Sequence, residues 1–177
     1  MKEVHIKLLI ISLILFGVMV FATGTIAQES RKPWNDLNYL EGTWIGVYDN
    51  PQMQHISERN TYRWDKSKSY LTVSVQLTMN GKPFDSGYGF MTIDQTQNTL
   101  RSHMIAGIGM VHEMYEIERE VDGVLFEGKT VGLPFMPEFR FKMKIVSDNK
   151  FTYTFLMKQD GKWIHQMVAT YERINNQ

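Results

Sequence analysis

The chain contains no cysteine among its 177 residues. Disulfide bonds and a lipid-modified N-terminal cysteine are therefore both excluded. A fold without disulfide bonds must be stabilised by its apolar core. About 150 residues follow residue 27, which is enough for one domain with a substantial buried interior.

The chain also lacks an excess of charge of either sign, with 19 basic and 19 acidic residues. Lys2, Glu3 and Lys7 lie in the first 27 residues, and without them the net charge is about −1. A neutral surface of this kind does not favour binding to nucleic acid or to an anionic membrane. We therefore expect neither of them as a partner.

A long apolar run is missing except near the N-terminus, at residues 8–22. This run follows Lys2 and Lys7, precedes the small-residue stretch "TIA" at 25–27, and is shorter than the roughly 20 residues of a membrane-spanning helix. The pattern is that of a secretory signal. It predicts a signal peptide over 1–27, an N-terminal segment over 28–41, and a periplasmic or secreted domain over 42–174.

Sustained helical periodicity is absent as well. A short helical turn is expected in "PWNDLNYL" at 33–40, because Pro33 and Asp36 suit a helix start. Almost everything after it alternates with period two, as in "FRFKMKIV" at 139–146. The alternation predicts ten strands, at 43–49, 55–64, 69–78, 84–94, 99–105, 111–121, 124–130, 138–146, 150–158 and 163–174.

Turn-forming pairs separate several of these strands. Asn80-Gly81, Asp122-Gly123, Asp148-Asn149 and Asp160-Gly161 suit tight primed turns, so the strands should form an antiparallel meander. An open meander would leave two bare edges, and closure removes both. We therefore expect an all-β fold, a single antiparallel up-and-down β-barrel of about ten strands with a short N-terminal helical turn.

Successive turns of such a barrel fall at alternate ends. One end collects the connections at 65–68, 94–98, 122–123 and 148–149, and also the segment that leads into Trp44. The other end collects two apolar loops, "AGIGM" at 106–110 and "VGLPFMP" at 131–137, which is unusual for solvent-facing connections. This pattern predicts a floor near Trp44 and a mouth near residues 131–137.

A helical turn followed by Gly42-Thr43-Trp44 resembles the Gly-x-Trp signature of lipocalins and other calycin-type barrels. The stretches "GYGFMTID" at 87–94, "DGVLFEGK" at 122–129 and "DGKWIHQMVATYERI" at 160–174 are similar to a family of exported bacterial lipocalin-like β-barrel proteins of unknown function. The resemblance covers residues 37–174. It implies a lipocalin-like barrel with Trp44 as its floor plug.

The strand count and the stretch "HQMVATYER" at 165–173 also resemble nitrobindin-type haem barrels. Those barrels take their axial histidine from the last strand, which here would be His165. On the alternation of that strand, Trp163, His165, Met167 and Tyr171 share one face, and we take this face as interior. The opposite face, with Ile164, Val168 and Ile174, is nearly as apolar.

Two other histidines could act together. A symmetric hairpin around residues 107–108 would place His103 opposite His112, with Cβ atoms about 5 Å apart. Met110, His112 and Met114 would add a soft donor set suited to copper(I). The alternative is that Leu100, Met104, Val111, Tyr115 and Ile117 form the core face, which turns both histidines outward and Tyr115 inward, and this second arrangement is the one we favour.

A polar spot is expected inside the barrel. Glu58, Asn60, Tyr62 and Trp64 share one face of the second strand, and an unpaired carboxylate there would be costly. Either Glu58 contributes to a small-molecule site, or it pairs with an arginine near the rim.

We find no nucleophile elbow, HExxH motif, phosphate-binding loop or spaced carboxylate pair, so the sequence offers no support for catalysis. It predicts an exported barrel that binds a small, largely apolar molecule, without an assigned cofactor, catalytic residue or metal ligand. The candidate ligand-binding residues are Trp44, Glu58, Tyr62, Tyr115, Phe141, Trp163 and His165. The alternatives are a haem- or metal-binding barrel that uses His165 or the His103/His112 pair, and an isomerase or lyase with His165 and Glu58 as acid and base.

Overall fold

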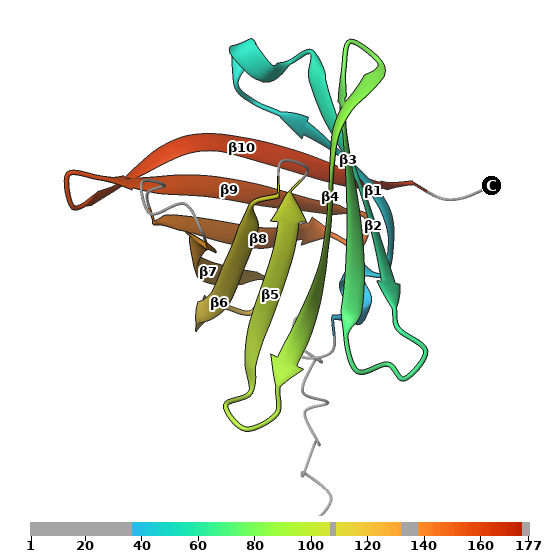
Figure 1. Cartoon of the computed structure of the whole chain (residues 1–177), viewed down its shortest axis with the longest axis vertical. Coiled ribbons are helices and arrows are strands. Elements are labelled where there is room, and N and C mark those ends of the chain that lie inside the picture. The colour runs from blue at the N-terminus through green and yellow to red at the C-terminus, as the bar shows by residue number, and fades with distance from the viewer. Residues whose placement is uncertain (1–36, 107–108, 132–137, 175–177) are drawn as a thin grey trace, which may run out of the picture. The chain divides into compact units, whose positions relative to one another are not determined.

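The computed structural model describes residues 37–106, 109–131 and 138–174. Two short 3-10 turns and ten strands make up the regular structure in these ranges (Figure 1). The elements are η2 (Asn38–Leu40), β1 (Gly42–Tyr48), η3 (Pro51–Met53), β2 (Ile56–Trp64), β3 (Leu71–Met79), β4 (Lys82–Asp94), β5 (Thr99–Ala106), β6 (Val111–Arg119), β7 (Gly123–Val131), β8 (Phe139–Ser147), β9 (Lys150–Gln159) and β10 (Lys162–Ile174). Over the same ranges, no helix has the length and apolar character needed to cross a membrane.

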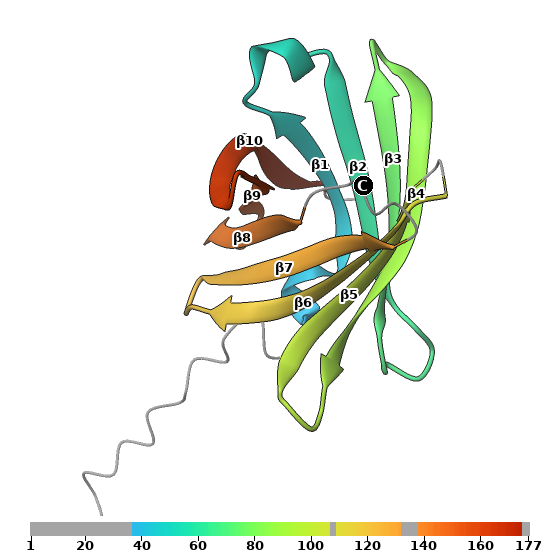
Figure 2. The same cartoon turned by 60° about the vertical axis from the view of Figure 1, so that its left-hand side comes forward.

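Each strand pairs antiparallel with the next, and β1 also pairs with β10, so the sheet closes on itself (Figures 1 and 2). The predicted all-β, up-and-down barrel is confirmed. Every strand begins and ends within two residues of its predicted limits. The short helical turn expected before the first strand is present as η2.

Two of the four predicted primed turns are confirmed. Asn80-Gly81 and Asp160-Gly161 have positive φ at both positions, as a type I′ turn requires. The prediction is wrong for Asp122-Gly123 and Asp148-Asn149, neither of which has positive φ. Gly123 already belongs to β7, and its carbonyl accepts a hydrogen bond from the Glu120 amide at 2.8 Å, so that chain reversal is wider than two residues.

The closed end of the barrel is packed beneath the strands. Leu37, Leu40 and Trp44 are fully buried, and η2 lies at this end of the barrel in both views (Figures 1 and 2). Leu71, Leu100 and Phe151 complete the layer of fully buried large side chains. This end is the predicted floor.

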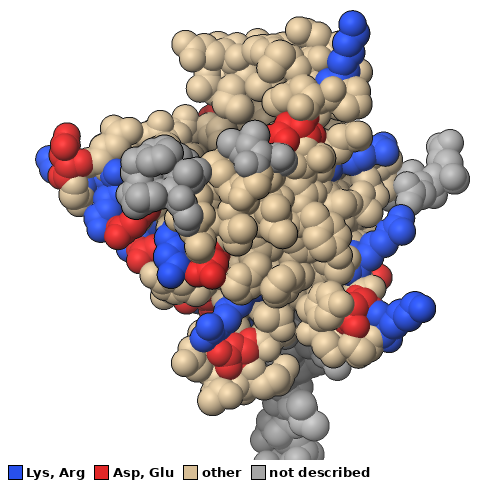
Figure 3. Space-filling view, in the orientation of Figure 1, with Lys and Arg blue, Asp and Glu red and all other residues tan. Residues whose placement is uncertain are grey.

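The outer surface is divided into an ionic side and an apolar side. Ion pairs join the outward residues of β6, β7 and β8, including Lys129 with Glu113 and Arg140 with Glu127. Over β4 and β5 the surface carries few charges (Figure 3), and Tyr88, Phe90 and Ile105 are exposed there. An apolar outer face of this kind weakens any rule that assigns the more hydrophobic side of a strand to the core.

Candidate functional site

The barrel encloses a cavity of about 360 Å³. Seven aromatic and five methionine side chains supply most of its lining, and a smaller group of polar side chains lies among them. The aromatic members are Tyr48, Tyr62, Phe126, Phe141, Phe151, Tyr153 and Tyr171. Residues 132–137 of the predicted mouth loop lie outside the described residues.

Trp44 closes the cavity from below without lining it. Its indole nitrogen donates a hydrogen bond to the Leu40 carbonyl at 2.8 Å, and its ring packs edge-on against Phe151 at 4.7 Å between centroids. Phe151 in turn stacks on Tyr171, with centroids 4.7 Å apart, and both of these rings line the cavity. Trp44 is thus buried as predicted, but it lies one layer beneath the site, which corrects its place among the candidate ligand-binding residues.

A small residue on β1 makes room for one of these rings. Gly46 lies opposite Tyr171, and a Cβ at Gly46 would fall 2.4 Å from a ring carbon of that tyrosine. The ring of Tyr171 therefore lies over Gly46. On its other side, Gly46 pairs with Glu58 of β2. Gly128 plays the same part for Phe139 on the other side of the barrel.

The polar end of the cavity centres on Glu58 and Asn60, which face inward from β2. The Tyr48 hydroxyl donates to Glu58 Oε2 at 2.5 Å. The alternative in which Glu58 pairs with an arginine at the rim is therefore wrong, because a phenol from the neighbouring strand takes that place. Asn60 is 5% exposed, and its Oδ1 has no hydrogen-bond partner.

Four phenols line the same cavity as Glu58. Burial raises the pKa of Tyr48, Tyr62, Tyr153 and Tyr171 above the usual tyrosine range, and the nearby Glu58 charge raises it further. For Tyr62, a hydrogen bond with Asn60 opposes part of this rise in pKa. All four hydroxyls therefore remain protonated at neutral pH and can donate hydrogen bonds.

His112 is the histidine of the cavity lining. Its Nδ1 lies 3.1 Å from Thr130 Oγ1, and its ring meets Phe139 edge-on at 5.4 Å. Burial lowers the pKa of His112 below its usual value, so the ring is neutral at pH 7. The favoured outward orientation of this residue is wrong, because His112 pairs with Met104, an inward residue of β5.

The alternative in which His103 and His112 form a pair is also wrong. His103 lies opposite Glu113 and stacks on Phe90 at 4.9 Å, on the outer face of the sheet. The hairpin is offset by one residue from the symmetric register, so the two imidazoles face opposite sides. Within the described ranges, no three histidine or carboxylate side chains gather as a metal site would require.

Tyr115 lies outside the barrel and is 45% exposed, which corrects its predicted interior position. Its hydroxyl donates to Glu127 Oε1 at 2.9 Å. Because His112 faces inward, alternation along β6 turns Tyr115 outward. A bulge between Glu116 and Glu118 interrupts the same strand further on.

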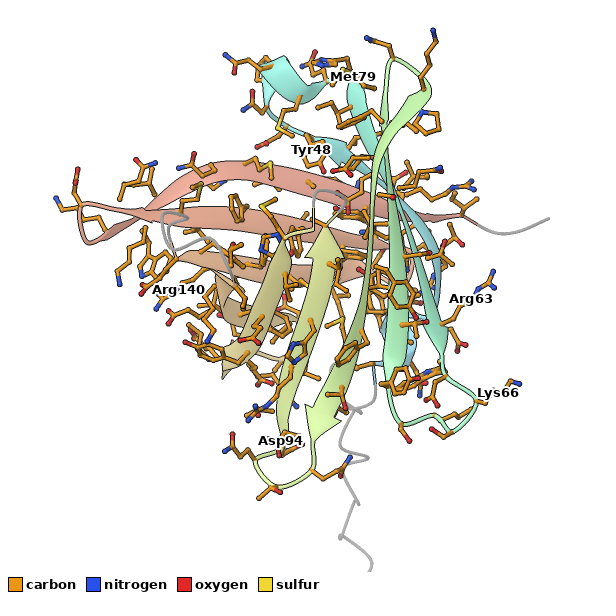
Figure 4. All side chains as sticks on the ribbon, viewed as in Figure 1. Tyr48, Arg63, Lys66, Met79, Asp94 and Arg140 are labelled. Atoms are coloured by element: carbon orange, nitrogen blue, oxygen red, sulfur yellow. The ribbon has the colours of Figure 1, made fainter. Side chains whose placement is uncertain are left out.

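Trp163 and His165 also lie outside, contrary to the prediction. A bulge in β10 shifts the register between His165 and Met167, so His165 lies opposite Leu156 and is exposed. The guanidinium carbon of Arg140, a residue labelled in Figure 4, lies over the Trp163 ring, 4.1 Å from the ring centroid. The enzyme alternative loses its acid–base pair, because Glu58 lines the cavity and His165 does not.

Three predicted residues do line the cavity together, namely Glu58, Tyr62 and Phe141. Sequence reasoning missed Tyr48, Tyr153 and Tyr171 as site residues. Tyr48 could have been found, because it follows Trp44 and Gly46 on the same face of β1. Tyr153 and Tyr171 lie on β9 and β10, and the closure of the barrel brings them into the same lining as Glu58.

No protein-family model matches the chain, and no curated protein matches it. Among solved structures, it is similar to a redesigned β-barrel at 18% identity, with 80% of this chain and 96% of that chain covered and a TM-score of 0.44. It is also similar to the protein EF1p2_mFAP2b bound to DFHBI, at 14% identity, 80% and 98% coverage and a TM-score of 0.40. A third similar structure is a de novo fluorescence-activating β-barrel, at 15% identity, 77% and 94% coverage and a TM-score of 0.37.

Proposed function

We propose that this protein binds a small, largely apolar molecule inside its barrel. The carrying observation is the cavity of about 360 Å³ inside the barrel, lined mainly by aromatic rings and methionines and also by a smaller group of polar side chains. Methionine side chains adapt their shape to a bound molecule, and rings give a large contact area. A few hydrogen-bonding groups at one end would orient the ligand.

Haem binding through His165 is the less favoured function. That histidine is exposed on the far side of a bulge from the cavity-lining Met167. An axial ligand must reach the iron from within the pocket. Small-molecule binding needs no such ligand and is the function that the geometry supports better.

We further propose that the protein is exported and that its barrel is lipocalin-like. The support is the charged, apolar and small-residue pattern of residues 1–27, which lie outside the described residues, together with the Gly42-Thr43-Trp44 step. Intact-mass measurement on protein recovered from outside the cytoplasm should give a chain that begins at Gln28. A mass that retains residues 8–22 would contradict export by cleavage.

The binding proposal is tested with N-phenyl-1-naphthylamine, a neutral probe whose fluorescence rises in apolar surroundings. Met104→Trp would fill the cavity with a large side chain, whereas Ile105→Trp adds the same ring on the outer face. We expect Met104→Trp to weaken probe binding at least about tenfold and Ile105→Trp to leave it unchanged. Equal binding by the wild type and a folded Met104→Trp variant would show that the cavity is not the site.

A further inference from the structure

The polar end of the cavity carries negative charge without a matching positive charge. Glu58 and Asp85 both line it, and no lysine or arginine occurs among the described lining residues. His112 lines the cavity too and is neutral at pH 7, because burial lowers its pKa. An anionic ligand placed here would meet two carboxylates and no cation.

The two carboxylates are arranged in a row. Glu58 of β2 and Asp85 of β4 each lie opposite Leu77 of β3, so they flank that residue on the inner face of three adjacent strands. Two strand spacings separate their backbones by about 10 Å.

The hydrogen-bonding groups at this end need a donor. Glu58 receives a hydrogen bond from Tyr48, but a carboxylate has further lone pairs to fill. Asn60 Oδ1 is buried without any partner, and a buried acceptor in that state costs free energy until a donor reaches it. An ammonium group has donors only and so satisfies both residues.

The aromatic rings favour the same kind of ligand. The faces of tyrosine rings attract cations, most strongly where water is excluded. Tyr62 and Tyr171 are buried and Tyr153 is half-buried, and all three line the cavity together with Glu58. Further inside, Met91, Phe126 and Met143 offer an apolar surface for the rest of the molecule.

We infer that the ligand is an organic amine, a protonated ammonium group on an apolar body. Its nitrogen is held by Glu58 and Asn60, with Asp85 adding charge, and its apolar part lies among the methionines and phenylalanines. The inference rests on the proposed binding function and specifies its ligand class. The same charges disfavour amphiphilic acids such as fatty acids.

The test compares three ligands of one shape as competitors of N-phenyl-1-naphthylamine: 4-phenylbutylamine, 4-phenylbutan-1-ol and 4-phenylbutyrate. We expect the amine to displace the probe at a concentration at least about tenfold lower than the alcohol does, because a tenfold difference in affinity corresponds to the free energy of about one charge-assisted hydrogen bond. The acid should be the weakest competitor. Glu58→Gln should remove the preference for the amine over the alcohol, both measured on the same variant.

Three variants support the comparison. Glu58→Met is a second way to remove the charge if Glu58→Gln does not fold, because an apolar side chain of similar size replaces the carboxylate without adding a polar group. Glu113→Gln removes one charge from the outer face and should keep the amine preference. Ile105→Trp, on the outer face, should also keep it.

The outcomes separate the two proposals. If the probe binds, and the alcohol displaces it at the same concentration as the amine or at a lower one, the amine assignment is overturned and the binding function stands. An amine preference that survives in both Glu58→Gln and Glu58→Met also overturns the assignment. No probe binding, and no heat stabilisation of the protein by any of the three competitors, contradicts the binding function itself.

Discussion

The guanidinium carbon of Arg173 lies 4.1 Å from the centre of the Trp44 ring. The same guanidinium donates hydrogen bonds to the carbonyls of Tyr39 and Glu41, on either side of Leu40. The end of β10 is thereby tied to the turn that precedes β1. Floor, first strand and last strand are joined by one pair of side chains.

Trp44→Ala should destabilise the fold by about 3 to 5 kcal/mol, because it removes a fully buried aromatic ring from the floor. Urea unfolding followed by circular dichroism measures this change. Trp163→Ala is the matched control on the outer surface and should cost about 1 kcal/mol or less. A change near zero for Trp44→Ala would mean that this ring does not stabilise the floor.

Arg173→Lys should also destabilise the fold, by about 1 to 2 kcal/mol, since an ammonium cannot both stack on the indole and reach two carbonyls. Arg63→Lys serves as the control, because Arg63 is exposed and points away from the barrel (Figure 4). The two free energies of unfolding are compared in the same buffer. Equal values for both variants would argue against a special role for Arg173.

Gly46→Ala should cost about 1 to 3 kcal/mol, because the added methyl group would collide with the Tyr171 ring. The origin of the cost is checked with a double-mutant cycle. In a Tyr171→Ala background the same glycine substitution should be nearly neutral. A cost that persists in that background would place its origin in the backbone instead of the ring contact.

His112 should make stability depend on pH. Burial lowers the pKa of His112 in the folded protein below the ordinary 6.5 of the unfolded chain. Below about pH 6.5 the unfolded state therefore binds more protons at His112 than the folded state does. The contribution of His112 to stability is fully present above that pH and is lost as the pH decreases.

Thermal unfolding between pH 5 and pH 8 measures this effect. His112→Gln should flatten the decline in Tm below about pH 6.5, whereas His165→Gln, at an exposed position, should leave it unchanged. An identical pH profile for the wild type and His112→Gln would show that His112 does not cause the decline.

The strands and their closure could be predicted because alternation and turn chemistry are local properties. The inward face of β2 was also predictable, since no bulge interrupts Glu58, Asn60 and Tyr62. The inward face of β6 could not be predicted. Its outward residues Val111 and Tyr115 are the more apolar set, so hydrophobicity points to the wrong side.

The register that turns His112 inward is set by its pairing with Met104 across an asymmetric hairpin. The phenols around Glu58 depend on contacts between strands that are distant in sequence. The Tyr171 ring keeps its position in the cavity lining because Gly46 leaves room for it. Period-two reasoning considers each strand by itself and therefore could not bring these side chains together.

The bulge in β10 gives this strand one residue more than its partner needs. His165 lies opposite Leu156 and Met167 opposite Phe155, so Gln166 has no position of its own in the ladder. Loss of Gln166 would restore a regular pairing and keep every side chain on its present face of the sheet. Loss of Thr170 would instead turn the side chains on one side of the deletion to the opposite face. Chain length can therefore vary by one residue at Gln166 without altering the chemistry of the cavity.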